Sequence, residues 1–157
     1  MRRENGFTLM EMIVVLMIIG MLAAFGFPAM SKFLTTQAVR SASYDLFSDL
    51  IYARSEAIAR GVSVEIVGNS ATNFKQGWNI RENGAGTVIR TQAARDSAIN
   101  FTSSVSSIRF DRTGRAESAV EVTFSIVPTE TTTQDYMKRC IRLDPSGRPK
   151  SAEGACA

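Results

Sequence analysis

Histidine is absent from this chain of 157 residues, and proline, cysteine and tryptophan are scarce, at 4, 2 and 1 residues. The absence of histidine removes the commonest metal ligand and the base of the Ser/His/Asp and Cys/His nucleophile systems. The Ser, Asp, Glu and Lys residues show no spacing typical of an activated nucleophile or a pair of catalytic carboxylates. We therefore expect no catalytic residue, no metal site and no cofactor.

The balance between apolar and charged residues excludes a disordered chain. Hydrophobic residues make up 45% of the sequence and charged residues 21%, with a formal net charge of +3. A disordered chain would be poor in apolar residues and rich in charge of one sign. Length and composition therefore predict one folded domain.

The apolar residues are concentrated near the N-terminus. Residues 12–27 carry no polar side chain, and the preceding residues back to Phe7 add only Thr8 and Glu11. A helix over this stretch rises about 31 Å, close to the roughly 30 Å of a bilayer's hydrocarbon core. Because two arginines precede the run, the positive-inside rule predicts a transmembrane helix over residues 7–28 with a cytoplasmic N-terminus.

A cleaved secretory signal is the alternative explanation, with Ala24-Phe25-Gly26 as a weak cleavage site. Glu11 argues against it, because a charged residue at bilayer depth costs about 3 kcal/mol and a disposable signal has no use for it. Helical patterning also continues past Pro28. The sequence thus favours one long helix.

The second half of this helix, residues 29–61, is amphipathic. Its apolar or small residues recur at spacings of three and four: Val39, Ala42, Leu46, Leu50, Ala53 and Ala57. The opposite side carries polar residues: Arg40, Asp45, Asp49, Arg54 and Glu56. Gly61 follows as a helix stop. We expect the apolar stripe to pack on a sheet.

After Gly61 the hydrophobic period falls to two, which is typical of β-strands. Strands are expected at residues 62–67, 78–81, 87–92, 98–102, 108–111, 120–127 and 137–144. The predicted class is α+β, with the long N-terminal helix packed on a C-terminal antiparallel β domain over residues 62–157. Trp78 is expected to be a core anchor whose indole N–H is paired.

The start of the apolar run carries a specific motif. The sequence GFTLME at residues 6–11 resembles the prepilin-peptidase motif of type IV pilins and type II secretion pseudopilins. The resemblance implies that residues 1–6 are a leader, that prepilin peptidase cuts between Gly6 and Phe7, and that Phe7 is then N-methylated. It also implies a helix kink at Pro28 and contact with an inner-membrane assembly platform.

The same resemblance gives Glu11 a role in assembly. A carboxylate in a bilayer is unfavourable when isolated and compensated when it faces an ammonium group. The resemblance implies that this group is the N-terminal amine of Phe7 in a neighbouring subunit, so that the pair sets the axial register of the filament. Snorkelling of Glu11 to the lipid headgroups is the alternative.

A second resemblance extends over most of the chain. Residues 52–58, the pair Gly77-Trp78, and later Phe110 and Gly114 are similar to the GspH/FimT family of minor pilins and minor pseudopilins. This resemblance implies the type IV pilin fold and a minor type IV pilin in the complex that primes the pilus and caps its tip. The implied partners are other major and minor pilins. A minor pseudopilin (H type) of a type II secretion system is the alternative.

The implied location changes during assembly. The protein would first reside in the inner membrane as a single-pass chain, in contact with membrane lipid, and then in a periplasm-spanning pilus at the cell surface. Cys140 and Cys156 lie outside the membrane in this topology, hence in an oxidising compartment. We expect them to form a disulfide that ties down the C-terminal tail and contributes about 3 kcal/mol in the chain-entropy model.

Residues 136–157, here called the basic tail, hold the entire excess of positive charge. The basic residues of this tail are Lys138, Arg139, Arg142, Arg148 and Lys150. Clustered guanidinium groups bind phosphate oxygens and give salt-sensitive affinity for nucleic acid. These five residues are therefore candidate DNA contacts.

Part of the basic tail resembles a known DNA-capture motif. Gly147-Arg148-Pro149-Lys150 is similar to the Gly-Arg-x-Arg motif of FimT-like minor pilins that capture DNA in natural transformation, with lysine in place of the second arginine. The resemblance implies double-stranded DNA as a partner, and a main role as DNA receptor is a further alternative. The alternative is that these residues form a solvated turn whose charges only keep the tail soluble, with no ligand bound.

Overall fold

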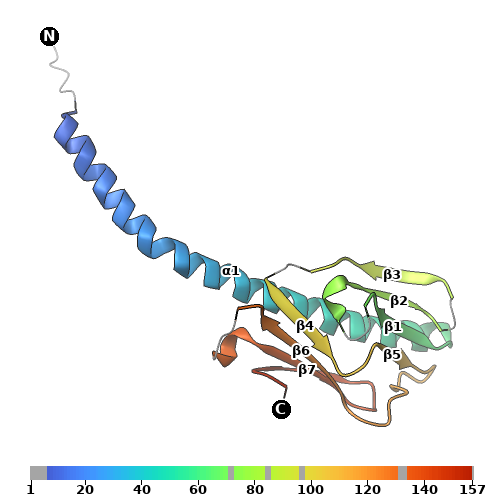
Figure 1. Cartoon of the computed structure of the whole chain (residues 1–157). Coiled ribbons are helices and arrows are strands. Elements are labelled where there is room, and N and C mark those ends of the chain that lie inside the picture. The colour runs from blue at the N-terminus through green and yellow to red at the C-terminus, as the bar shows by residue number, and fades with distance from the viewer. Residues whose placement is uncertain (1–6, 71–72, 84–85, 96–97, 131–133, 157) are drawn as a thin grey trace. The chain divides into compact units, whose positions relative to one another are not determined.

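The computed structural model describes residues 7–70, 73–83, 86–95, 98–130 and 134–156, except for the side chains of residues 25–29. Within these residues, helix α1 (Leu9–Arg60) is followed by eight strands and two short 3-10 helices (Figure 1). The chain divides into two compact units, Met1–Leu34 and Thr35–Ala157. The second half of the helix therefore belongs to the same unit as the strands.

The first unit contains the apolar part of α1. Its helical backbone extends from Leu9 through Pro28 to the end of the unit. The residues here are mostly Leu, Met, Ile, Val and Ala. Among these, Ala and Leu have high helix propensity. The side chain of Pro28 lies outside the described residues, so the kink stays a prediction.

In the second unit, α1 packs on the β-strands through its apolar stripe. All six predicted stripe residues are buried, and they join one hydrophobic core with residues of the strands. The helix ends as predicted, because Gly61 has a φ of +66° and its N–H donates to the Ala57 carbonyl at 3.0 Å. Asp49, predicted on the polar side, is buried instead, because it bonds to side chains of the sheet.

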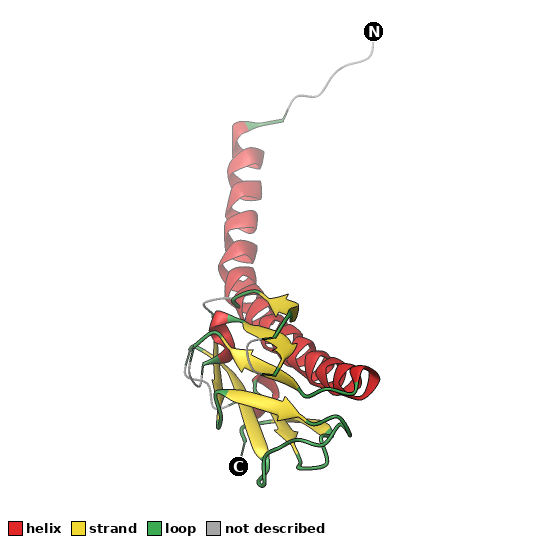
Figure 2. Cartoon of the chain, turned by 90° about the vertical axis from the view of Figure 1, so that its right-hand side faces the viewer, coloured by secondary structure: helices red, strands yellow, loops and turns green. Residues whose placement is uncertain are grey.

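The strands form two antiparallel sheets. The first has the order β3–β2–β1–β5 and the second the order β4–β6–β7–β8. The first is built from Val88–Gln92, Trp78–Glu82, Val64–Gly68 and Ser107–Phe110. The second is built from Ile99–Ser103, Val122–Pro128, Arg139–Leu143 and Pro149–Glu153. Figure 2 shows both sheets beside the second half of α1, which confirms the predicted α+β class.

The core between helix and sheets is rich in aromatic rings. Trp78 is fully buried, as predicted, and its ring centroid lies 5.8 Å from that of Phe101. Phe74, in the 3-10 helix Phe74–Gln76, packs edge-on against Phe124 at 5.2 Å. Edge-to-face pairs at such distances add to the free energy gained from burial. These rings join β2, β4 and β6 to the 3-10 helix.

Strand β8 is not among the strands predicted from the sequence. It pairs with β7, with Arg142 opposite Lys150 and Cys140 opposite Ala152. Four of its five residues are exposed, so it lacks the apolar alternation of a half-buried strand. Pro149 is tolerated because it is the first residue of an edge strand. A further 3-10 helix, Asp135–Met137, replaces the start of the strand expected at residue 137.

Candidate functional site

The first turn of α1 places Glu11 beside Thr8. Thr8 precedes the helix, and its hydroxyl accepts a hydrogen bond from the Glu11 backbone N–H at 3.2 Å. Its carbonyl accepts one from the Met12 N–H at 3.2 Å. Thr8 is thus an N-cap, and a carboxylate three residues later is favoured by the helix dipole. The Glu11 carboxylate has no hydrogen bond or ion pair within the described part of the chain.

The large apolar side chains that the structure describes in the first unit are exposed. Exposed fractions run from 39% at Ile13 to 78% at Leu9, and Phe7 is 74% exposed. Apolar surface of this extent calls for a partner in the functional state. Gly6, the other residue of the predicted cleavage site, lies outside the described residues. No helix in the described part of the chain is long and apolar enough to cross a membrane. The transmembrane helix over residues 7–28 stays a prediction.

The predicted disulfide is confirmed. Cys140 in β7 and Cys156 are bonded, with their Cα atoms 5.1 Å apart, and the bond closes a sequence separation of 16 residues. The bond holds the segment after β8 against the second sheet, where Cys156 Sγ lies 3.3 Å from the Phe124 carbonyl oxygen. The C-terminal tail is therefore fixed on the face of the sheet to which the side chain of Cys140 points.

The turn between β7 and β8 is organised by Asp144. Its Oδ1 atom accepts hydrogen bonds from the backbone N–H groups of Ser146 at 3.0 Å and Arg148 at 3.3 Å, and from the Ser146 hydroxyl. The hydrogen bond from the Ser146 side chain is the main reason that the pKa of Asp144 lies below its ordinary value of 3.8. The turn thus fixes the backbone from which the Arg148 side chain extends.

Three of the five candidate DNA contacts lie near this turn. Arg148 and Lys150 are exposed, and Arg142 is half-buried opposite Lys150. Neither Arg142 nor Arg148 makes a side-chain hydrogen bond or ion pair with a described residue, while Lys150 Nζ lies 3.8 Å from Asp144. The guanidinium groups of Arg142 and Arg148 are therefore available to an anionic ligand.

The other two candidate contacts are paired with carboxylates at the opposite end of the hairpin. Arg139 forms an ion pair with Glu153 at 2.8 Å, and Lys138 forms one with Asp135 at 3.1 Å. Glu153 is directly opposite Arg139 in the β7–β8 register. The structure thus separates the five basic residues into two groups. Among the described residues, the guanidinium groups near the turn have no partner, whereas Arg139 and Lys138 are paired.

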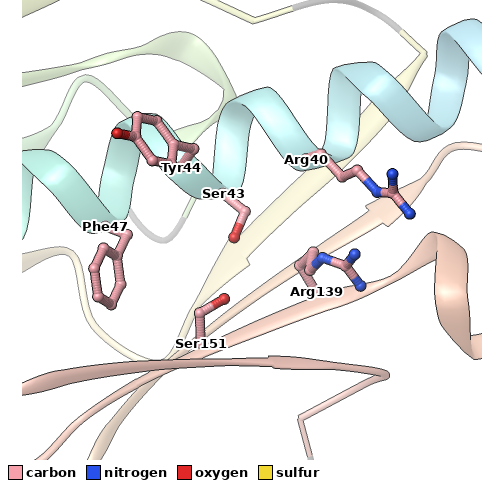
Figure 3. A pocket seen from close by; sticks show the side chains of 6 residues that line it. All are labelled: Arg40, Ser43, Tyr44, Phe47, Arg139 and Ser151. Atoms are coloured by element: carbon pink, nitrogen blue, oxygen red, sulfur yellow. The ribbon is translucent and has the colours of Figure 1, made fainter.

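An open hollow lies between α1 and β8. Its volume is about 320 Å³, and it is lined by Arg40, Ser43, Tyr44, Phe47, Arg139 and Ser151 (Figure 3). These residues provide two guanidinium groups and two aromatic rings but no carboxylate. Across the described residues, no group of three His, Cys, Asp or Glu side chains could hold a metal ion.

The arrangement of a long helix on antiparallel sheets matches that of solved pilins. The type IV minor pilin FimU of Pseudomonas aeruginosa PAO1 aligns in two crystal forms. The first form gives a TM-score of 0.62 and 22% identity, and the alignment covers 72% of this chain and 91% of FimU. The second gives a TM-score of 0.63 and 21% identity, and the alignment covers 78% of this chain and 98% of FimU. The minor pseudopilin EpsH of the Vibrio cholerae type 2 secretion system aligns with a TM-score of 0.57 and 10% identity. This alignment covers 73% of this chain and 96% of EpsH.

These likenesses establish a type IV pilin fold, and the family follows from the sequence matches. Residues 42–147, more than half of the chain, match the family model described as Type II transport protein GspH. Residues 1–27 match the Prokaryotic N-terminal methylation motif. The chain therefore belongs to the GspH family, and its class is that of the minor pilins and pseudopilins, as the sequence resemblance implied. No curated protein matches it.

Proposed function

We propose that this chain is a minor type IV pilin that assembles with other major and minor pilins in the complex that primes the pilus and caps its tip. The observation that carries this proposal is the exposed apolar surface of the first unit, which a GspH-type domain follows in the chain. Such a surface is stable only where lipid or other apolar helices cover it. The role is structural, in keeping with a family of pilins and pseudopilins.

The proposed pathway begins at the inner membrane. Prepilin peptidase removes residues 1–6, and Phe7 becomes the methylated N-terminus. The assembly platform then moves the chain into the filament, where the apolar helix packs among those of other subunits. In this account, lipid covers the exposed apolar side chains of the first unit first, and neighbouring pilins cover them afterwards. The match of residues 1–27 to the methylation motif supports the processing of the N-terminus.

Glu11 is proposed to set the register between subunits. Its carboxylate has no partner among the described residues, and the Phe7 amine of a neighbouring subunit would supply the opposite charge. A buried carboxylate without an ammonium partner is strongly unfavourable, so the pair favours one axial position.

The experiment compares Glu11→Ala and Glu11→Gln with Glu121→Ala, which removes an exposed carboxylate from the β domain. The ratio of this chain in sheared filaments to that in membranes is measured by immunoblot. Both Glu11 variants should remain in the membrane and be lost from filaments, while Glu121→Ala behaves as wild type. Normal filament content of Glu11→Ala would overturn the register role.

A second candidate function is DNA capture by the basic tail. The exposed, unpaired guanidinium of Arg148 and the neighbouring Arg142 and Lys150 favour it. Lys150 keeps the charge of the Gly-Arg-x-Arg motif but loses the planar fork that binds phosphate bidentately. The double variant Arg148→Ala with Lys150→Ala should abolish DNA uptake while pili persist, and unchanged uptake would contradict this function.

A third candidate is a minor pseudopilin of H type, which the fold of EpsH favours. The phenotype of a deletion separates it from the first candidate. Loss of piliation supports the pilin, whereas loss of exported proteins from the medium with normal piliation supports the pseudopilin.

A further inference from the structure

The pattern Asp-x-Ser/Thr-Gly-Arg occurs twice in the chain, at residues 111–115 and 144–148. The first copy follows β5 of the first sheet, and the second follows β7 of the second sheet. We call them the first and second Gly-Arg turns. The second contains Arg148 of the basic tail, whereas the first has no part in the functions proposed above.

The two turns have the same hydrogen bonds. Asp111 Oδ1 accepts from the N–H of Thr113 at 2.7 Å, the Thr113 hydroxyl at 2.6 Å and the N–H of Arg115 at 3.0 Å. This is the pattern that Asp144 makes in the second turn. In both turns the glycine has a φ of +78°, and its N–H donates to the aspartate carbonyl. Each turn therefore holds its arginine backbone in the same way.

The two turns are also in contact with each other. A Cβ atom added at Gly147 would lie far inside van der Waals contact of the Gly114 carbonyl oxygen. A Cβ added at Gly114 would lie 2.6 Å from Ile58 Cδ1 and 3.0 Å from Arg54 Nε, both on α1. Only glycine permits this close backbone approach together with a positive φ. The fold thus brings the two turns and Arg54 together.

This junction has an excess of unpaired guanidinium groups. Arg112, Arg115 and Arg148 are exposed, and none makes a side-chain hydrogen bond or ion pair with a described residue. Arg54 Nε is buried without a hydrogen-bond partner. By contrast, six other arginines lie within ion-pair distance of a carboxylate: Arg60, Arg81, Arg90, Arg95, Arg109 and Arg139.

The acidic residues of the junction do not neutralise this charge fully. Asp111 and Asp144 each use one oxygen to organise their own turn. Hydrogen bonds from the turn, chiefly from Thr113 and Ser146, keep the pKa of both carboxyls below the ordinary value. The junction thus combines four guanidinium groups with two carboxylates that already take part in the hydrogen bonds of the turns.

We infer that the two Gly-Arg turns form one composite binding site for the phosphate backbone of double-stranded DNA. Arg115 and Arg148 are its central contacts, and Arg112 and Arg54 flank them. Arginine matches phosphate oxygens bidentately, and turns that already hold the arginine backbones reduce the ordering cost of binding. The contacts are to phosphate, so the site does not depend on DNA sequence. This inference rests on the proposed DNA capture and extends it from the basic tail to the first turn.

The test uses the detergent-solubilised full chain and a fluorescein-labelled 30-base-pair duplex, with binding measured by anisotropy at several salt concentrations. Arg115→Ala and Arg148→Ala are compared with Arg40→Ala, which removes an exposed, unpaired arginine from the hollow between α1 and β8. Each turn variant should reduce the slope of log affinity against log salt by about 0.9 and weaken binding about eightfold at 0.1 M salt. Arg40→Ala should behave as wild type.

The outcomes separate the composite site from tail-only capture. If Arg115→Ala binds like Arg40→Ala while Arg148→Ala weakens binding, the composite site is wrong and capture by the tail stands. If the wild-type chain does not bind the duplex, DNA capture itself fails. Circular dichroism of each variant checks that a loss of affinity is not a loss of folding. Equal losses for Arg115→Ala and Arg148→Ala in folded protein support the composite site.

Discussion

The indole Nε1 of Trp78 donates a hydrogen bond of 2.8 Å to Asp49 Oδ2 across the interface between β2 and α1. The other oxygen of Asp49 accepts from Arg90 on β3 at 2.8 Å, and the Arg90 guanidinium also lies 4.3 Å from the centroid of the Tyr52 ring. Hydrogen bonding to Asp49 raises the pKa of Arg90. One carboxylate thus joins the helix to two strands of the first sheet.

Replacement of Asp49 by alanine should lower the free energy of unfolding by about 2–3 kcal/mol. The loss arises because the fully buried Trp78 N–H is left without an acceptor. Asp45→Ala is the matched control, since Asp45 lies on the same helix and pairs with Arg95 but is 32% exposed. Urea denaturation should show the larger loss of stability for Asp49→Ala. An equal or larger loss for Asp45→Ala would contradict the stabilising role of the Asp49–Trp78 hydrogen bond.

Gly147→Ala should destabilise the fold more than Gly61→Ala. Both glycines have a positive φ, so both substitutions carry backbone strain of about 1–2 kcal/mol. Only at Gly147 does the new Cβ collide with the Gly114 carbonyl, whereas nothing lies within 4 Å at Gly61. Thermal unfolding of the two variants measures the difference. Equal melting temperatures would show that the two turns are not in close contact.

Helix positions were the most predictable part of the fold. Residues 39–57 repeat apolar side chains every three or four positions, and all six predicted stripe residues are buried. Asp49 was misplaced because its burial depends on Trp78 and Arg90, which are 29 and 41 residues away in sequence. Local periodicity carries no information on such long-range partners.

The edge strand and the turn junction were harder to predict for different reasons. Strand β8 begins with proline and is largely exposed, so only its pairing with β7 identifies it. The contact between Gly114 and Gly147 joins two sheets, and no local pattern predicts that contact. The repeated Asp-x-Ser/Thr-Gly-Arg sequence was nevertheless a visible signal, because identical turn chemistry at two places predicts identical arginine placement.

Removal of the disulfide should lower the stability of the β domain by about 3 kcal/mol, the value expected for a loop of this length. The double variant Cys140→Ser with Cys156→Ser avoids a free thiol. Its urea midpoint is compared with that of wild-type protein with and without reductant. Reduced wild type should match the variant, and a midpoint unaffected by either change would contradict a stabilising role for the bond.

Acid should weaken the two Gly-Arg turns. Folding lowers the pKa of Asp111 and of Asp144 below 3.8 through turn hydrogen bonds. The ionised carboxylates therefore stabilise the fold above that pH, and their contribution is lost as the pH falls through the lowered values. Melting temperatures between pH 2 and 5 should fall more steeply for wild type than for Asp111→Asn with Asp144→Asn. Glu121→Gln serves as the control. Parallel curves of melting temperature against pH for wild type and the double variant would contradict this prediction.

The central claim is that the chain is processed at its N-terminus and then built into a filament. Its most direct test is mass spectrometry of the mature protein recovered from sheared filaments. The account predicts an N-terminus at Phe7 that carries one methyl group, with Gly6 and the preceding residues removed. Filament protein that begins at Met1, or that is cut after Gly26, would contradict the account.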